Sequence, residues 1–260
     1  MKCKVCGKEA EIKFTTKVLH KYDAEYYFCG NCKFLFAGNP FWLEESYKRP
    51  INLADTGLLR RNLFFARLVS VLIYFFFDKK GKFLDYAGGY GVFTRLMRDN
   101  GFDYYWNDPY CTNLLAAGFE YEIKTGDKIE LLTAFELFEH FTDPLESDKL
   151  LEISRNIIFS TMLLPDQIPE PDKWWYYGFD HGQHISFYSK ETLQFMARKN
   201  NLNFYSALGL HIFTEKRINR IKLHILLAAA ILGLNKIVKK IMGSKTETDN
   251  VMMSRRENLK

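Results

Sequence analysis

The chain has 260 residues, of which 47% are hydrophobic and 16% aromatic, so it can bury a sizeable core and is not a disordered protein. The formal net charge is +5, but residues 216–260 carry 11 Lys or Arg against 3 Asp or Glu, a balance of +8 that leaves −3 for residues 1–215. The basic character therefore belongs to the tail and does not mark the main part of the chain as a binder of polyanions.

The first residues, MKCKVCGKEAEIKF, show no apolar targeting segment and no cleavage site, so a cytoplasmic location is expected. Two apolar stretches, residues 63–77 and 223–234, fall short of the roughly 18 to 20 apolar residues that a bilayer crossing needs. Neither stretch is predicted to span a membrane.

Four of the five cysteines lie near the N-terminus as two C-x2-C pairs separated by 22 residues: Cys3, Cys6, Cys29 and Cys32. This spacing is typical of a four-thiolate metal site, and zinc in a structural role is the leading interpretation. An iron centre of the same geometry and a set of buried or disulfide-bonded cysteines are the alternatives. Two alternating stretches between the pairs predict short strands, as in a zinc ribbon over residues 1–38.

A helix is predicted over Leu58 to Phe77, with Asp55 and Thr56 as its start signal. The stretch KFLDYAGGYGVF, residues 82–93, then reads as a strand, a glycine turn and the start of a helix. Such a turn places backbone N–H groups and the positive end of a helix dipole beneath a ligand. We therefore expect the turn to bind a nucleotide-like cofactor.

Strand and helix patterns alternate beyond the turn, which predicts a doubly wound, mainly parallel α/β sheet with ligands at the carboxyl ends of its strands. A strand ends at Asp108, and a helix is expected over residues 111–119. A buried strand that runs into a polar turn is expected over residues 128–140, and another strand over residues 156–164. No register of residues 87–94 gives the G-x-G-x-x-G pattern of dinucleotide sites, which disfavours a nicotinamide-dependent oxidoreductase. Asp85 is expected to meet a cationic amine, and Asp108 the two hydroxyls of a ribose.

These features resemble the class I S-adenosylmethionine-dependent methyltransferases from about residue 42 to about residue 214. Four motifs carry this resemblance: LDYAGGYG, with Ala87 in place of the usual first glycine, then WNDPY, TAFELFEHFTDP and GQHISFYSKETL. The resemblance implies S-adenosylmethionine as the methyl donor. It implies these cofactor-binding residues: Asp85, Ala87, Gly88, Gly89, Gly91, Asp108, Pro109, Phe135 and Glu136.

Glu136, Glu139 and His140 are spaced i, i+3, i+4 and are expected to share one face of a helical turn. With His184, this pattern is similar to the metal-binding set of two methyltransferase groups, which act on small RNAs and in the ubiquinone pathway. It would then hold a second divalent cation that lowers the pKa of an acceptor hydroxyl. The alternative is a metal-free reaction in which His140, His181 or His184 takes the proton of the hydroxyl.

Residues 169–184 contain prolines and four consecutive aromatic residues, 174–177, and are expected to form a long loop over the acceptor. The four aromatic residues either stack on a sugar or an aromatic acceptor, or two of them belong to the core. Residues 217–243 are helical in composition with basic ends, and are expected either to touch a membrane surface or to pack on protein. The last 17 residues are expected to be flexible.

The predicted organisation is a zinc ribbon over residues 1–38, a helical lead-in over 39–80, the cofactor-binding domain over 81–215 and a basic tail over 216–260. The expected activity is methyl transfer to a hydroxyl of a small or carrier-linked acceptor, with sugars of a glycan pathway ahead of other acceptors. Transfer to nitrogen or carbon, metal-assisted 2′-O-methylation of RNA and a non-catalytic RNA-binding module remain alternatives, although residues 1–40 lack an Arg-rich, aromatic-interleaved pattern.

Overall fold

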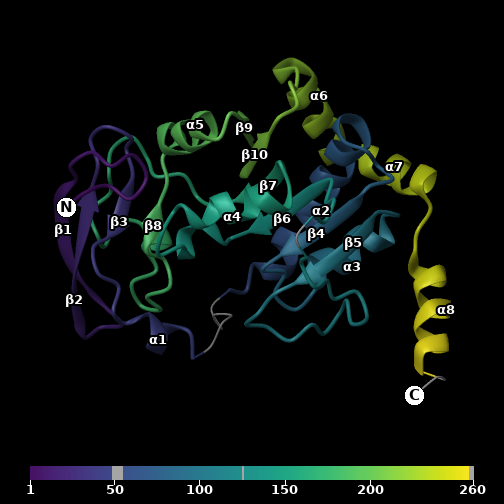
Figure 1. Cartoon of the computed structure of the whole chain (residues 1–260), viewed down its shortest axis with the longest axis horizontal. Helices are drawn as coiled ribbons and strands as arrows, with labels where there is room; N and C mark the ends of the chain where they lie inside the picture. The colour runs from purple at the N-terminus through teal and green to yellow at the C-terminus, as the bar shows by residue number, and fades with distance from the viewer. Residues whose placement is uncertain (49–54, 125, 258–260) are drawn as a thin grey trace. The chain divides into compact units, whose positions relative to one another are not determined.

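The computed structural model describes residues 1–48, 55–124 and 126–257. The chain forms two compact units (Figure 1). The first comprises Met1–Asn52, Phe135–Glu152 and Ile158–Lys216, and the second comprises Leu53–Ala134, Ile153–Ile157 and Arg217–Lys260. The predicted four-part division has different boundaries, and it stays a prediction.

The first unit contains a four-stranded sheet in the order β1-β2-β3-β8. Its strands are β1 (Glu11–Val18), β2 (Tyr22–Phe28), β3 (Leu35–Ala37) and β8 (Ser186–Phe187), and all neighbouring pairs are antiparallel. The first two are the strands that alternation predicts between the cysteine pairs. The edge strand β8 comes from much later in the chain, so the N-terminal sheet is completed by the segment that carries His184.

The four-stranded sheet packs on an aromatic core that includes Tyr26, Tyr176, Tyr177 and Phe187. The first unit contains further helical and strand elements. A capping box at Ser189 starts the helix that follows β8. The elements are α1 (Leu43–Ser46), the 3-10 turns η1 (Phe138–His140) and η2 (Trp175–Tyr177), α4 (Glu146–Ile153), α5 (Lys190–Lys199), β9 (Asn203–Ala207) and β10 (Leu210–Thr214).

A six-stranded sheet has the order β5-β4-β6-β7-β10-β9. Its other strands are β4 (Lys82–Tyr86), β5 (Asp103–Asn107), β6 (Leu131–Phe135) and β7 (Asn156–Ser160). Strand β4 pairs in parallel with both β5 and β6, whereas β9 and β10 form an antiparallel hairpin. The central strands are almost wholly buried, as expected of a parallel sheet covered on both faces. The predicted doubly wound, mainly parallel α/β fold is confirmed.

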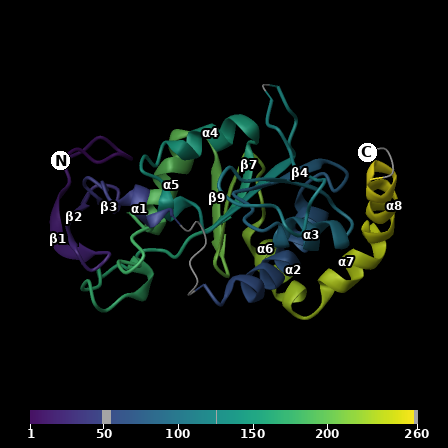
Figure 2. The ribbon, with the colours of Figure 1, turned by 90° about the horizontal axis from the view of Figure 1, so that it is seen from below.

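The second unit also holds the helices α2 (Leu58–Phe76), α3 (Val92–Asp99), α6 (Arg220–Ile231), α7 (Leu234–Met242) and α8 (Thr246–Glu257). Figure 2 shows α2, α6 and α7 side by side. The predicted helix over Leu58 to Phe77 is confirmed, but its N-cap residue is Gly57 and makes no side-chain cap. Asp55 instead forms a salt bridge with Arg61, at 2.7 Å.

The helix expected over residues 111–119 is wrong, because this segment folds as turns. The Asn113 side chain accepts a hydrogen bond from the backbone N–H of Ala116 and donates one to its carbonyl. Such local side-chain bonds compete with a helical ladder. The segment therefore forms a turn that lies against Gly91.

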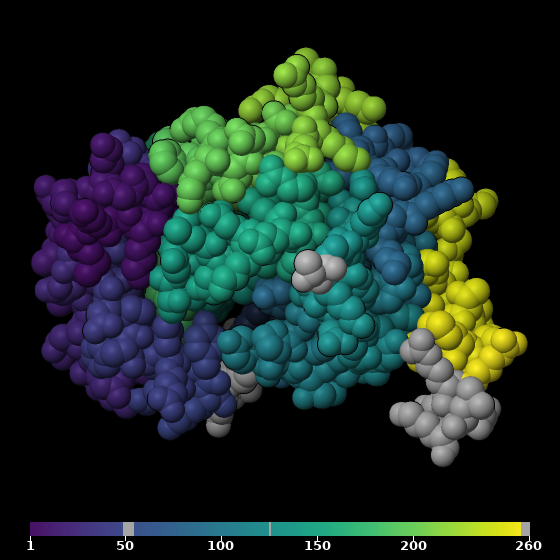
Figure 3. Space-filling view, viewed as in Figure 1, coloured from purple at the N-terminus to yellow at the C-terminus, as the bar shows by residue number. Residues whose placement is uncertain are grey.

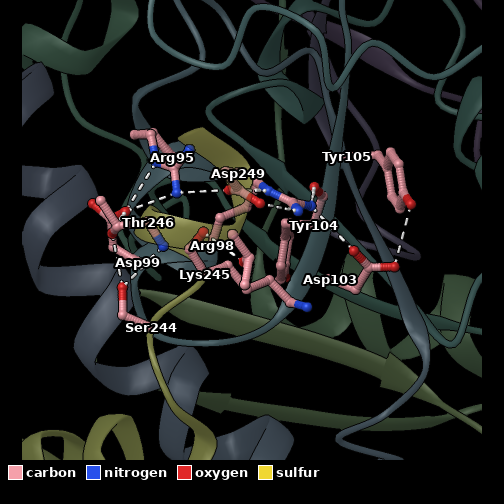
Figure 4. A network of polar contacts seen from close by, with 11 residues as sticks. Arg95, Arg98, Asp99, Asp103, Tyr104, Tyr105, Ser244, Lys245, Thr246 and Asp249 are labelled. Carbon is pink, nitrogen blue, oxygen red and sulfur yellow. Dashed lines mark hydrogen bonds and ion pairs between the residues drawn. The ribbon is translucent and has the colours of Figure 1, made fainter. Parts of the chain in front are cut away.

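The flexible tail expected at the C-terminus is also wrong where the structure describes it, since α8 is a helix and only residues 258–260 lie outside the described part. Asp249 of α8 accepts two hydrogen bonds from Arg98 of α3, from Nε and Nη2, both at 2.8 Å (Figure 4). Burial opposes the charge, yet bonding to Arg98 keeps the pKa of Asp249 below its usual value. Arg98 also lies over the Phe119 ring at 3.6 Å. A buried ion pair thus docks the tail helix on α3.

Among the described residues, no helix is both long and apolar enough to cross a membrane by itself. Helices α6 and α7 meet the criteria of length and composition only when taken together, and they are bent by 87° at the break between them.

Candidate functional site

The glycine turn connects β4 to α3 in the second unit. Ala87, Gly89 and Gly91 all have positive φ, at 55°, 54° and 79°. Gly91 is also sterically required, since a Cβ there would lie 2.5 Å from Oδ1 of Asn113. Ala87 adopts a conformation that costs an L-residue with a side chain roughly 1–2 kcal/mol. The strand, turn and helix predicted for residues 82–93 are therefore present, with a strained residue where a glycine is usual.

Asp85, at the end of β4, lies beneath this turn and is only 2% exposed. Its two carboxylate oxygens accept hydrogen bonds from Oγ1 of Thr94 at 3.1 Å and Oγ1 of Thr133 at 3.0 Å. Burial raises the pKa of Asp85 to about 7, and the two threonines oppose this rise. Asp85 is thus a buried support of the turn, and its contact with a ligand amine stays a prediction.

Asp108 follows β5 and is half-buried at the other side of the turn. One carboxylate oxygen accepts from the N–H of Gly89 at 2.9 Å, and the other accepts from the N–H groups of Tyr110 and Cys111 at 2.8 and 3.0 Å. A carboxylate has lone pairs for about four hydrogen bonds, so Asp108 keeps capacity for a ligand hydroxyl. Pro109, the next residue, is also a predicted cofactor contact, and it is exposed.

The N-terminus of α3 has no side-chain cap at its N-cap residue Gly91. An uncapped helix start above a glycine turn suits a carboxylate, and the Asp108 oxygens suit ribose hydroxyls. The residues of the second unit therefore fit a nucleoside cofactor that ends in an amino acid. Phe135 and Glu136 belong to the first unit, and their assignment as cofactor contacts stays a prediction.

A second polar cluster lies in the first unit and consists of Glu139, His140 and His184. One potential ligand atom from each residue lies within 4.8 Å of those of the other two. Three hydrogen bonds bring η1 and β8 together: Ile185 N–H donates to the Glu139 carbonyl at 2.9 Å, Ser186 Oγ to the Phe141 carbonyl at 2.7 Å and the Tyr188 hydroxyl to the Phe138 carbonyl at 3.0 Å. Tertiary pairing thus places His184 beside two residues that precede it by more than forty positions.

The imidazoles of this cluster are oriented by polar neighbours, and for His184 the neighbour also sets the tautomer. Nδ1 of His184 lies 2.6 Å from the Tyr176 carbonyl and must donate to it, which leaves Nε2 as the unprotonated nitrogen of the neutral ring. Nδ1 of His140 lies 3.0 Å from the Tyr47 hydroxyl. Burial lowers the pKa of His140 to about 4 and holds that of His184 well below its usual value. Both rings are neutral near pH 7.

Glu139 is fully buried, and neither of its carboxylate oxygens has a hydrogen-bond partner among the described residues. Burial raises the pKa of Glu139 to about 8, with a contribution from the charge of Glu136. The nearby Tyr176 and Thr161 hydroxyls oppose the rise, although neither is in hydrogen-bond geometry with the carboxyl. A buried carboxyl without partners costs about 1–3 kcal/mol or more. The arrangement therefore suits a ligand that would supply the missing positive charge or donor.

Glu136 does not share a helical face with Glu139 and His140, and this prediction was wrong. Its φ is +49°, and η1 begins only at Phe138. Oε1 of Glu136 accepts a hydrogen bond from Oγ of Ser160 at 2.5 Å. Glu136 therefore lies outside the three-residue cluster. His181 is close to it, with its ring centroid 4.8 Å from that of His184.

The aromatic residues of the loop after β7 divide between the core and the surface, so the second of the two alternatives holds for two of them. Tyr176 and Tyr177 are buried in the core, whereas the Trp175 side chain is 76% exposed. The Tyr176 ring lies 4.7 Å from the His184 ring, so the buried tyrosine forms a wall of the cluster. Trp175 is left as a flat apolar surface next to it in sequence.

The four N-terminal cysteines come together as predicted. Their sulfurs all lie within 4.8 Å of one another, and the Cys3–Cys32 and Cys6–Cys29 pairs are each 3.5 Å apart. A tetrahedron with Zn–S bonds of about 2.3 Å has edges of about 3.8 Å, so the set fits a zinc ion. The hydrogen bond between the Cys3 and Cys32 thiols lowers the pKa of Cys3 to about 5 and raises the pKa of Cys32. No disulfide forms among them.

The sequence did not single out the residues that support these sites. Thr133 is the one polar residue of the buried strand LLTAF, a signal that could have indicated a hydrogen bond under the turn. Thr94 similarly interrupts the buried face of α3. Tyr47 and Ser160 carry no local signal, because their partners His140 and Glu136 are distant in sequence.

Comparison with known proteins found no match among curated proteins. Among solved structures, TnmH is 15% identical with a TM-score of 0.44, covering 68% of this chain and 61% of TnmH. Human N-acetylserotonin methyltransferase, in complex with its cofactor, is 13% identical with a TM-score of 0.42, covering 68% and 66%. The mitomycin 7-O-methyltransferase MmcR is 14% identical with a TM-score of 0.42, covering 68% and 60%. This chain thus spans less than two thirds of each of these proteins.

The model of a methyltransferase domain family matches residues 59–207, which is more than half of the 260 residues. The match includes the glycine turn, Asp108 and the Glu139, His140 and His184 cluster. The chain belongs to this methyltransferase domain family, and it carries a four-cysteine cluster near its N-terminus.

Proposed function

We propose that the protein transfers the methyl group of S-adenosylmethionine to a hydroxyl of a small or carrier-linked acceptor. The observation that carries this proposal is the buried cluster of Glu139, His140 and His184. A sulfonium needs no help as a leaving group, so transfer to oxygen requires alignment and removal of the hydroxyl proton. Two neutral imidazoles beside an unpartnered carboxyl supply groups that can take this proton.

We further propose that Glu139, His140 and His184 bind a divalent cation, and two observations favour this. Neutral imidazoles are metal ligands, and a pKa of about 4 for His140 makes its ring a weak base. A cation bound by Glu139, His140 and His184 would give the unpartnered carboxylate a counter-charge and lower the pKa of a bound hydroxyl. One carboxylate and two imidazoles suit manganese, iron or zinc.

A sugar is the acceptor class that we place first. The support is the exposed Trp175, since a flat aromatic surface can stack on the apolar face of a sugar ring. We also propose that the four-cysteine cluster binds zinc in a structural role, because four thiolates leave no open position for a substrate.

The test uses the zinc-loaded protein and separates donor binding from transfer. Calorimetric titration with S-adenosylhomocysteine should show saturable binding that Asp108→Ala abolishes and His184→Gln leaves intact. Transfer of labelled methyl groups to a panel of sugars and phenols should then be lost in His184→Gln and Glu139→Gln, and in the wild type with a chelator that spares the cysteine cluster. Transfer that persists with the chelator but fails in His184→Gln would indicate an imidazole base without a cation. Transfer that persists in both variants would rule the cluster out of the chemistry.

A further inference from the structure

Helices α6 and α7 have one face that packs on protein. The buried side chains of α6 are Leu223, Leu226, Leu227 and Ala230, and Val238 is the buried one of α7. Both helices pack against α2, whose residues 65–73 are buried except for Arg67. This face is therefore part of the core of the second unit.

The other face of the same helices is apolar as well, and it is exposed. Leu232 is 88% exposed and Ile221 is 72% exposed. Ile225, Ile237 and Ile241 are each more than half exposed. These five side chains, which we call the outer face, lie on a segment that stands at the surface in the space-filling view (Figure 3). Single exposed apolar residues are common, but five on two consecutive short helices form a patch of the kind that marks an interaction site.

Charge distinguishes this segment from an ordinary apolar patch. Residues 217–243 contain six basic residues and no acidic one: Arg217, Arg220, Lys222, Lys236, Lys239 and Lys240. All six are exposed. Apolar side chains interleaved with lysine and arginine match a surface that presents negative headgroups above an apolar interior. A second copy of the same face would place six cations against six others, which opposes a symmetric dimer.

The geometry places the helices on such a surface and does not carry them through it. Helix α6 has 12 residues and α7 has 9, and the two are bent by 87°. At 1.5 Å per residue neither reaches the roughly 30 Å of a hydrocarbon core. One face of each also remains packed on α2.

We propose that the outer face of α6 and α7 binds the surface of a membrane that contains anionic lipids. The isoleucines and Leu232 enter the boundary between headgroups and acyl chains, and the surrounding lysines and arginines bind the phosphates. This surface is independent of the proposed chemistry. It would hold the enzyme where acceptors linked to a lipid carrier are found.

The experiment measures sedimentation of the zinc-loaded full chain with vesicles of phosphatidylcholine alone and with added phosphatidylglycerol. Binding to the anionic vesicles should weaken as salt rises. Replacing Lys236, Lys239 and Lys240 by Gln should weaken it roughly a hundredfold, given about 1 kcal/mol per basic residue near the surface. Replacing Ile225, Leu232 and Ile237 by Ser should weaken it at both low and high salt.

The matched controls are Ile12→Ser and Lys13→Gln on β1, where both side chains are also exposed, and neither should change binding. Retained binding of S-adenosylhomocysteine shows that each variant is folded and keeps a failure of vesicle binding separate from a failure of the proposed function. Equal binding to both kinds of vesicle, or binding that the α6 and α7 variants share with the wild type, would overturn the proposal. So would a concentration-dependent dimer that the serine variant abolishes, since the outer face would then bind a second copy.

Discussion

A buried carboxyl with a raised pKa lies beneath the glycine turn, and another lies in the histidine cluster. The two differ in their hydrogen-bond partners. Asp85 has a hydroxyl donor for each oxygen, whereas Glu139 has no hydrogen-bond partner among the described residues. Burial is the main cause of the raised pKa in both. The fold itself supplies a donor to each oxygen of Asp85, whereas it supplies none to Glu139 among the described residues, and we propose that a ligand takes this place.

The largest expected effect is the pH dependence of the Asp85 contribution to stability. The unfolded chain ionises this carboxyl near pH 4, while the folded protein keeps it protonated up to about pH 7. The folded state therefore binds more protons between these values, and stability falls as pH rises through this window. Relative to Asp85→Asn, which stays neutral, the wild type should lose on the order of 4 kcal/mol between pH 4 and pH 7.

Urea unfolding of both proteins without cofactor, at steps of one pH unit, measures this difference. Groups other than Asp85 titrate in both proteins and cancel in the comparison. A difference that does not change with pH would mean that Asp85 is ionised in the folded protein.

Asp249 is a third buried acid, and it differs from Asp85 and Glu139 because an ion pair with Arg98 compensates its charge. Arg98→Ala leaves Asp249 with Arg95 alone, and Asp249→Ala leaves Arg98 with Asp103. Each variant removes the two short charge-assisted hydrogen bonds of the buried pair, so each should lower the free energy of unfolding by roughly 3 kcal/mol. The double variant should lose less than the sum of the two. The exposed pair between Lys17 and Asp23 is the control, and its removal should cost less than about 1 kcal/mol. Equal losses at the two pairs would contradict the docking of α8 through Asp249.

Ligand response is the sharpest test of the difference between Asp85 and Glu139. Manganese(II), added to the zinc-loaded protein at a hundred times its dissociation constant, should stabilise the wild type by about 2.7 kcal/mol. Glu139→Gln should lose this gain, because it removes a ligand, and Asp85→Asn should keep it. Thermal unfolding with and without the ion measures both. Stabilisation that survives in Glu139→Gln would place the ion elsewhere and leave the unpaired carboxyl without a ligand role.

The smallest expected effect concerns the strain at the turn. Ala87→Gly removes the cost of a positive φ but makes the unfolded chain more flexible, so stability should change by no more than about 1 kcal/mol. Affinity for S-adenosylhomocysteine should be unchanged, since the backbone keeps its conformation. A tenfold loss of affinity would show that the Ala87 methyl group contacts the cofactor. The measurement is a calorimetric titration of both proteins, together with their unfolding in urea.

Local patterns were sufficient for the elements whose causes are local. Alternation predicts β1 and β2, apolar spacing predicts α2, and the glycine pattern predicts the turn between β4 and α3. The C-x2-C pairs predict the four-cysteine cluster because two residues between cysteines already direct both thiols to one point. Patterns were misleading at residues 111–119 and in the tail. There a side-chain turn at Asn113 and a buried ion pair at Asp249 outweigh the composition of the segment.

The sequence by itself determined the parallel α/β fold, the family and the residue types available at each strand end, because these depend on hydrophobic period and short motifs. Only the tertiary structure decided which of these residues meet. The pairing of β3 with β8 and the bonds between β8 and η1 bring His184 to Glu139 and His140, and the left-handed backbone of Glu136 removes that residue from the set. Burial also decided that Asp85 is a support, since exposure depends on residues far away along the chain.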